Sequence, residues 1–280
     1  MANGVNITRI VREIIKYALV VIILVLIIAP FYWIFISSVK PTEELIRAKP
    51  TFIPEIFTLS HYQDLFAASD YIGYLLNSTY VALGTMMITV VLASLAAYSV
   101  YRCKYRGRDL ILMSLLISYV FPGALLVVPL YRMMTSFHLV NSLASLVIVN
   151  VTFTAPFSVW LLRSFFRTIP QEIEEAATID GAGRLRVLFS IFFPLAAPGI
   201  GTVAIYTFLT SWTEYLFANI LIVDDLKKTL PVGLARFITQ YNVDWGLLTA
   251  GAIATAVPPI IVFAMVGRNF IKGLTAGSLK

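Results

Sequence analysis

An acidic, alanine-rich stretch within residues 169–194 carries the residue types best suited to a specific contact in this 280-residue chain. Pro170 suits the first turn of a helix, where its missing N–H costs little. Acidic side chains in the next turn complement the positive end of the helix dipole, and glycine after aspartate can end the helix. The residues concerned are Glu172, Glu174, Glu175, Ala176, Ala177, Asp180 and Gly181. They predict a short docking helix, with a low alanine face and a charged contact at Glu175.

The residues after this turn predict a second helix with one apolar face. Four apolar side chains recur at i, i+3, i+4 and i+7, beside Arg184 and Arg186. They are Leu185, Leu188, Phe189 and Phe192. A hairpin lying on lipid headgroups would explain this second helix. It would not explain the first helix, because an anionic leaflet repels three glutamates. We therefore expect a protein partner at the first helix.

The chain lacks the sequence patterns of the common catalytic and metal sites. It has no Gly-x-x-x-x-Gly-Lys-Ser/Thr phosphate loop and no His-Glu-x-x-His motif. His61 and His138 lie in different segments between apolar runs, and Cys103 is the single cysteine. No apolar run carries the series of acids and histidines typical of a proton-coupled pump. We predict no enzyme, no cofactor and no metal site, and any work of transport must enter from another chain.

Composition places these residues in a membrane protein. Hydrophobic residues make up 59% of the chain and charged residues 13%, with a mean hydropathy of +0.85. Soluble proteins contain roughly 45–50% apolar residues. The net charge of +6 does not indicate nucleic acid, because the basic residues lie in short clusters between apolar runs. Six runs are long enough to cross a bilayer, and we place the spans near 17–37, 76–100, 110–132, 143–164, 199–222 and 247–268.

The lysines and arginines orient these spans. With the N-terminus in the cytoplasm, fourteen of them fall in cytoplasmic segments and seven on the opposite side, as the positive-inside rule requires. We expect a multi-pass protein of the cell membrane with both termini cytoplasmic. The expected segments are a cytoplasmic N-terminus at 1–16, a six-span domain at 17–268, external loops at about 40–72 and 223–245, a cytoplasmic loop at 169–194 and a cytoplasmic tail at 269–280.

The cytoplasmic loop resembles a known family motif. Glu175-Ala176-Ala177, three residues, Gly181, nine residues, Ile191, one residue and then Phe193-Pro194 is similar to the EAA loop of binding-protein-dependent ABC importer permeases. That family usually has leucine where this chain has Phe193. The resemblance implies an all-α, type I ABC importer permease-like bundle of six transmembrane helices. It also implies a coupling helix that docks on an ATP-hydrolysing subunit through Glu175, Ala176, Ala177, Asp180 and Gly181.

Three further segments are similar to the carbohydrate branch, the smaller permease of maltose-transporter type. They are Asn77-Ser78, Ser211–Tyr215 and Gly273–Gly277. The resemblance implies a sugar or oligosaccharide importer in which this chain forms half of the pathway by alternating access. Its implied partners are an ABC ATPase dimer, a second related permease, an extracytoplasmic solute-binding protein and membrane lipid. The tail, with Thr275, Ala276 and Gly277, is expected to reach the ATPase.

Polar residues inside the expected spans are candidates for the pathway or the permease–permease interface. Glu214 is the sole acidic residue in these spans, and a charged side chain near the bilayer centre costs roughly 2.5–3.5 kcal/mol on insertion scales. Trp212 and Tyr215 flank it, and Asn150 lies midway along the fourth span. Three roles stay open for Glu214: an outer-rim carboxylate in water, a subunit contact or a substrate contact.

Other functions remain as alternatives to the sugar importer. An ABC permease for another substrate class needs the same coupling loop. A secondary carrier or channel would transport without ATP and without a cytoplasmic partner. A membrane scaffold or assembly factor would not stimulate ATP hydrolysis by candidate partners. The acidic helix at 171–180 favours the ATP-driven importer, because neither rival explains it.

Overall fold

The computed structural model describes residues 7–67, 69–103, 105–239 and 243–277, and side chains between 11 and 267 within these ranges. They divide into two compact units. The first unit extends to Ser69 and includes Phe237–Ala254, and the second comprises Asp70–Arg236 and the chain from Thr255 onward. The described residues form helices and no strand, apart from one isolated bridge between Ile238 and Val243. The predicted all-α class is confirmed.

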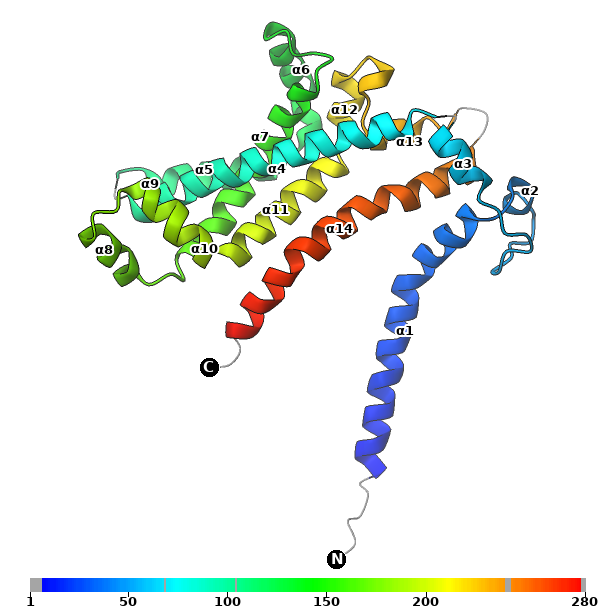
Figure 1. Cartoon of the computed structure of the whole chain (residues 1–280), viewed down its shortest axis with the longest axis horizontal. Coiled ribbons are helices and arrows are strands. Elements are labelled where there is room, and N and C mark those ends of the chain that lie inside the picture. Colours follow the sequence, from blue (N-terminus) through cyan, green and yellow to red (C-terminus); the bar gives the residue numbers. More distant parts are fainter. Residues whose placement is uncertain (1–6, 68, 104, 240–242, 278–280) are drawn as a thin grey trace, which may run out of the picture. The chain divides into compact units, whose positions relative to one another are not determined.

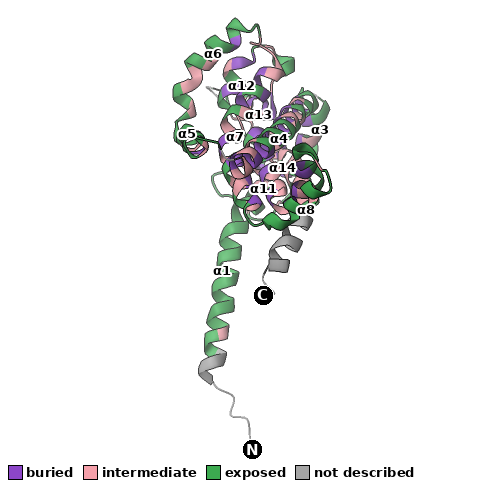
Figure 2. Cartoon of the chain, turned by 90° about the vertical axis from the view of Figure 1, so that its left-hand side faces the viewer, coloured by how far each residue is buried: buried purple, intermediate pink, exposed green. Residues whose placement is uncertain are grey.

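The first unit contains the long helix α1 and three shorter helical segments. They are α1 (Ile7–Ser38), α2 (Thr42–Leu45), α3 (Ser60–Ala67) and the first part of α14 (Trp245–Gly277), which continues into the second unit. Figure 2 shows α1 exposed along almost all of its described length. Because its side chains are apolar, α1 needs lipid or another chain around it.

The second unit is built around three packed helices, α4 (Tyr71–Arg102), α7 (Leu143–Phe166) and α11 (Ala197–Trp212). Small residues such as Ala93, Ala97 and Ser158 are fully buried between them, as expected where membrane helices approach closely. Thr89 and Thr154 share a hydrogen bond of 3.0 Å between α4 and α7. These contacts hold α4, α7 and α11 together in one bundle, to which the shorter helices attach.

The shorter elements of the second unit lie at the ends and side of this bundle (Figure 1). They are α5 (Arg108–Val120), η1 (Gly123–Leu126), α6 (Val127–Ser136), α8 (Gln171–Ile179), α9 (Arg184–Val187), η2 (Leu188–Phe192), α10 (Phe193–Leu195), α12 (Leu216–Leu221), η3 (Asp225–Lys227) and α13 (Leu230–Ala235). Helices α8 and α9 lie at one end of α4, and α12 and α13 lie toward the other end. The bundle therefore lies between the α8–α9 hairpin and the α12–α13 segment.

Two expected spans are not single straight helices. The third, near 110–132, bends by 94° between α5 and the η1–α6 segment. Pro122 causes the break, because it lacks an N–H and disfavours a helical conformation at Phe121, which is extended with ψ 129°. The fifth, near 199–222, ends at Trp212 and resumes only at Leu216. The described part of the chain has four helices long and apolar enough to span a membrane, or up to six if two bent pairs each count as one span. These pairs are Arg108–Val120 with Gly123–Ser136, and Arg184–Leu195 with Ala197–Trp212, which bends by 85°.

The second half of the hairpin at 169–194 also differs from the expectation. Leu188 and Phe192 are buried, whereas Leu185 is 63% exposed and Phe189 is 43% exposed. The reason is the π-helical turn at Leu188–Phe192, whose wider i→i+5 repeat interrupts the 3.6-residue periodicity. The four apolar residues therefore do not share one face, and only two of them join the core.

Candidate coupling site

Helix α8 has the bounds expected of the docking helix. It begins after Pro170 and ends at Ile179, and Gly181 adopts a left-handed φ of +83°. The Gly181 N–H donates to Thr178 O at 3.0 Å and the Ala182 N–H to Ala177 O at 2.9 Å. This pair of bonds is the Schellman arrangement that ends a helix at glycine. The turn points the chain back toward α9.

One side of α8 is attached to the end of α4. Glu174 is 6% exposed, and its Oε1 accepts a hydrogen bond from the Tyr98 hydroxyl at 2.8 Å. The same oxygen pairs with Arg102 Nε at 2.8 Å. Ala177, three residues further on, packs against the core cluster that contains Phe192 and Leu162. A charged hydrogen bond is worth about 1.5–3 kcal/mol, so this carboxylate anchors the helix.

The other side of α8 faces solvent and carries the predicted docking residues. Glu175, Ala176, Asp180 and Gly181 are exposed, and Ala177 is half-buried. Ile179 is 86% exposed, although it is a large apolar residue. Gln171 Nε2 donates to Glu175 Oε1 at 2.7 Å, one turn along the helix. Small, apolar and acidic groups together make a surface that a protein partner can cover.

The hairpin after α8 is held by aromatic packing. The ring of Phe192 meets Tyr98 edge-on at 5.2 Å and Phe166 at 5.3 Å between centroids. A cavity of about 320 Å³, lined partly by Tyr98, Arg102, Glu174 and Arg184, lies between the hairpin and the end of α4. Glu174 therefore joins α8 to α4, and Phe192 joins the rest of the hairpin to α7.

The anchoring residues were not among the sequence-predicted site residues. The sequence patterns assign Glu174 only to the helix dipole and Arg102 only to the positive charge that orients the spans, and they give Tyr98 no role. One signal was available, because Glu174 and Ala177 are three residues apart and so share a helix face. Nothing local indicated their partners, which lie more than seventy residues earlier in the chain.

Asn150 and Trp212 are both buried in the bundle and have separate hydrogen-bond partners. Asn150 Nδ2 donates to Ser211 Oγ at 2.9 Å, and Ser211 Oγ donates to Thr85 Oγ1 at 3.3 Å. Trp212 is 2% exposed, and its Nε1 donates to Thr255 O at 3.2 Å. Asn150 and Trp212 therefore bond within the second unit, through Ser211–Thr85 and Thr255 respectively, and a pathway role for them stays a prediction.

Glu214 turns toward α12 rather than toward Asn150. Its two carboxylate oxygens accept the N–H groups of Phe217 at 2.7 Å and Ala218 at 3.0 Å. Unpaired N–H groups at a helix start favour such an acceptor. Tyr215 is 44% exposed beside it. The carboxylate thus has backbone partners in the break after α11, and its role at a pathway or subunit interface stays a prediction.

The expected contact at the C-terminus lies at the limit of the described chain. Helix α14 continues to Gly277, so Thr275, Ala276 and Gly277 form its last turn rather than a separate tail. Their side chains lie outside the described part of the structure, as do residues 278–280 entirely.

Comparison with known proteins places this geometry in a family. Residues 89–269 match the family model described as binding-protein-dependent transport system inner membrane component. The inner membrane ABC transporter permease protein YcjP of Escherichia coli (strain K12) is 38% identical, over 94% of this chain and 95% of that protein. The diacetylchitobiose uptake system permease protein NgcG of Streptomyces coelicolor is 32% identical, over 95% of this chain and 88% of that protein.

The fold has a counterpart among solved structures. A chain from a bacterial ABC transporter involved in the import of the acidic polysaccharide alginate matches with a TM-score of 0.83 at 21% identity. The match covers 96% of this chain and 100% of that chain. The residues matched by the family model include all of α8 and α9.

Proposed function

Because the chain belongs to the family of binding-protein-dependent transport system inner membrane components, it is a multi-pass ABC importer permease, and we propose that α8 couples it to a separate ATPase. The observation that supports this role is the division of α8 into two sides. Glu174 holds one side against α4. The opposite side exposes Glu175, Ala176 and Asp180.

The proposed mechanism is alternating access driven from outside the chain. ATP binding closes the ATPase dimer and displaces the docked α8. The Glu174–Arg102 pair transmits this displacement to α4, and Phe192 transmits it to α7. The bundle of α4, α7 and α11 then rearranges, so that the pathway closes toward one face of the membrane and opens toward the other. Conformational work, rather than bond chemistry, is the task of this subunit.

The proposed substrate is a sugar or oligosaccharide. A relative takes up diacetylchitobiose, and the matched solved transporter imports alginate. An importer for another substrate class would use the same α8. The proposed partners are an ABC ATPase dimer, a second related permease and an extracytoplasmic solute-binding protein. With both termini in the cytoplasm, as the lysine and arginine distribution favours, α8 faces the ATPase, and Thr275–Gly277 form a second contact with it.

A substitution on the exposed side of α8 tests this proposal. Ala176→Arg adds a long charged side chain to the docking surface without touching Glu174. We expect the amount of ATPase that co-purifies with the permease to fall at least tenfold, while the permease still inserts in the membrane. Ser136→Arg, at the end of α6, is the matched control and should leave ATPase recovery unchanged. Retention of the ATPase by Ala176→Arg at the control level would contradict the proposal.

A further inference from the structure

The segment after α2 exposes an unusual number of large apolar side chains for a loop. We call residues 46–59 the apolar loop. Its six large hydrophobic residues are between 50% and 75% exposed. They are Ile46, Phe52, Ile53, Ile56, Phe57 and Leu59. Large contiguous apolar patches on a protein surface mark interaction sites, so this loop needs an apolar neighbour.

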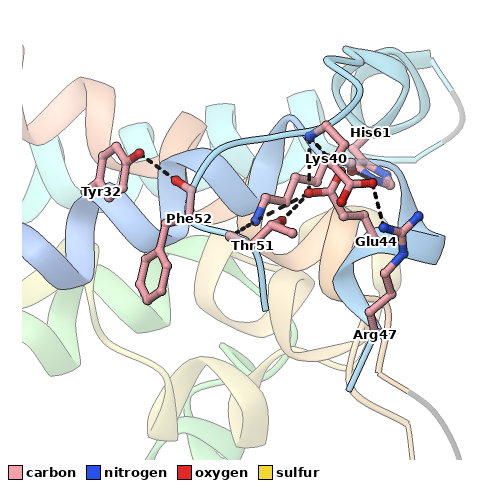
Figure 3. Close-up of polar contacts among 8 residues, drawn as sticks. Tyr32, Lys40, Glu44, Arg47, Thr51, Phe52 and His61 are labelled. Carbon is pink, nitrogen blue, oxygen red and sulfur yellow. Dashed lines mark hydrogen bonds and ion pairs between the residues drawn. The ribbon is translucent and has the colours of Figure 1, made fainter. Parts of the chain in front are cut away.

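The apolar loop returns along α1 instead of extending away from it. The Tyr32 hydroxyl donates to Phe52 O at 2.7 Å (Figure 3), and the rings of Trp33 and Phe52 meet edge-on at 5.7 Å. The Thr58 N–H donates to Val39 O at 2.9 Å and closes the loop at the helix end. Tyr32 precedes Ser38, the last residue of α1, by six residues, or about 9 Å of helix rise. Phe52 is therefore held at the level of the apolar helix.

Three of the five charged residues of α2 and the apolar loop are paired within the first unit, and Glu43 and Lys49 have no ion pair among the described residues. Lys40 and Glu44 are 3.8 Å apart with side chains 3% and 1% exposed, and Thr51 bonds to both. Arg47 and Glu55 pair at 2.6 Å. The hydrogen bond from Thr51 lowers the pKa of Glu44 below its ordinary value, so this carboxylate stays charged beside Lys40. Paired charges reduce the cost of leaving bulk water.

We propose that the apolar loop lies in the bilayer interface, at the headgroup–hydrocarbon boundary of the leaflet next to the C-terminal end of α1. The candidate span in α1 is Val11–Ser38, and its run free of charged residues begins at Tyr17, after Lys16. At 1.5 Å per residue, a hydrocarbon core about 30 Å thick takes about 20 residues from Tyr17 and ends near Ser37, so Tyr32 and Trp33 lie within about two helical turns of its boundary. Tyr and Trp are the residues enriched at this depth. The occupant of the apolar patch is then the phospholipid that already surrounds α1.

Such an anchor sets the depth of the first unit in the membrane. His61 of α3 bonds to Lys40 O at 2.8 Å, and a Cβ at Gly246 would overlap the ring of His61. The end of α1, α3 and the start of α14 are thus packed together beside the anchored loop. Phe52 and Ile53 hold this group at the interface.

Depth-dependent fluorescence quenching tests the proposal. In the full-length complex in lipid nanodiscs, with Cys103→Ser removing the single cysteine, Ile53→Cys or Ile56→Cys carries a fluorescent label. We expect lipid with a nitroxide near the headgroup to quench these labels at least threefold more than aqueous iodide does. Gln63→Cys, on the exposed polar side of α3, is the control and should be quenched mainly by iodide.

Two results would overturn the proposal. Iodide quenching at residues 53 and 56 equal to that at residue 63 would place the apolar loop in water. Quenching by neither reagent would place it against another protein chain. Two label positions are used so that local disturbance by one label does not decide the outcome.

Discussion

Glu174 and Glu175 are neighbours in sequence with opposite surroundings. Glu174 is buried against Tyr98 and Arg102, whereas Glu175 faces solvent beside Ala176. A buried carboxylate without its cation is costly, so Glu174 has a structural task that Glu175 does not share. Adjacent residues of α8 therefore have different tasks, since Glu174 anchors the helix and Glu175 belongs to its exposed docking side.

Replacing Glu174 by glutamine should loosen α8 without changing its exposed side. Glu174→Gln removes the ion pair with Arg102, worth about 1.5–3 kcal/mol. We therefore expect amide hydrogen exchange in residues 172–179 to increase at least tenfold in the purified complex. Glu172→Gln, on the same helix but exposed, is the control and should change exchange less than threefold. Equal effects of the two substitutions would contradict the anchoring role.

The turn between α8 and α9 sets the direction in which the chain leaves α8. Gly181 has a φ of +83°, whereas Gly183, two residues later, has an ordinary φ of −69°. A Cβ at either position would meet no atom within 4 Å. The two glycines therefore differ in backbone conformation and not in available space.

This difference predicts unequal effects of alanine at the two glycines. Gly181→Ala should destabilise the turn by about 1–2 kcal/mol, because an L-residue is disfavoured in the left-handed region. Hydrogen exchange of residues 176–183 should then rise by about 5- to 30-fold. Gly183→Ala should be neutral or slightly stabilising, because it reduces the freedom of the unfolded chain. Similar exchange in the two variants would show that the turn does not depend on Gly181.

Close approach between helices holds the second unit together. Gly199 of α11 lies so near Phe165 of α7 that a Cβ would overlap its ring and Cβ. Gly73 of α4, by contrast, has open space where its Cβ would be. Since apolar burial gives membrane helices no advantage over lipid, such close packing holds the bundle together.

Alanine should lower the thermal stability of the protein at Gly199 but not at Gly73. Gly199→Ala overpacks the α7–α11 contact, at a cost of about 1–3 kcal/mol, and should lower the unfolding midpoint of the purified protein in detergent by several degrees. Gly73→Ala should leave the midpoint unchanged or raise it, because alanine favours a helix by about 1 kcal/mol over glycine. A stable Gly199→Ala variant would show that α7 and α11 separate without cost.

The features that depend on local physics are predictable from the sequence. Run length and composition predicted a helical membrane protein, and the acidic turn, Pro170 and Gly181 predicted α8 with its correct end. The spacing from Glu175 to Pro194 indicated the family to which the chain belongs. Each of these signals lies within one apolar run or one short segment, so no distant contact is needed to read it.

Which side of each element is used depends on contacts between distant parts of the chain. Glu174 faces inward because Tyr98 and Arg102, at the end of α4, are there to receive it. The apolar loop returns toward α1 because Tyr32 bonds to Phe52, twenty residues away. Leu185, Leu188, Phe189 and Phe192 do not share the single face that a regular α-helix predicts, because a π-helical turn interrupts the 3.6-residue repeat. These outcomes depend on partners far apart in the chain, and a pattern read along the sequence contains no information about which distant groups meet.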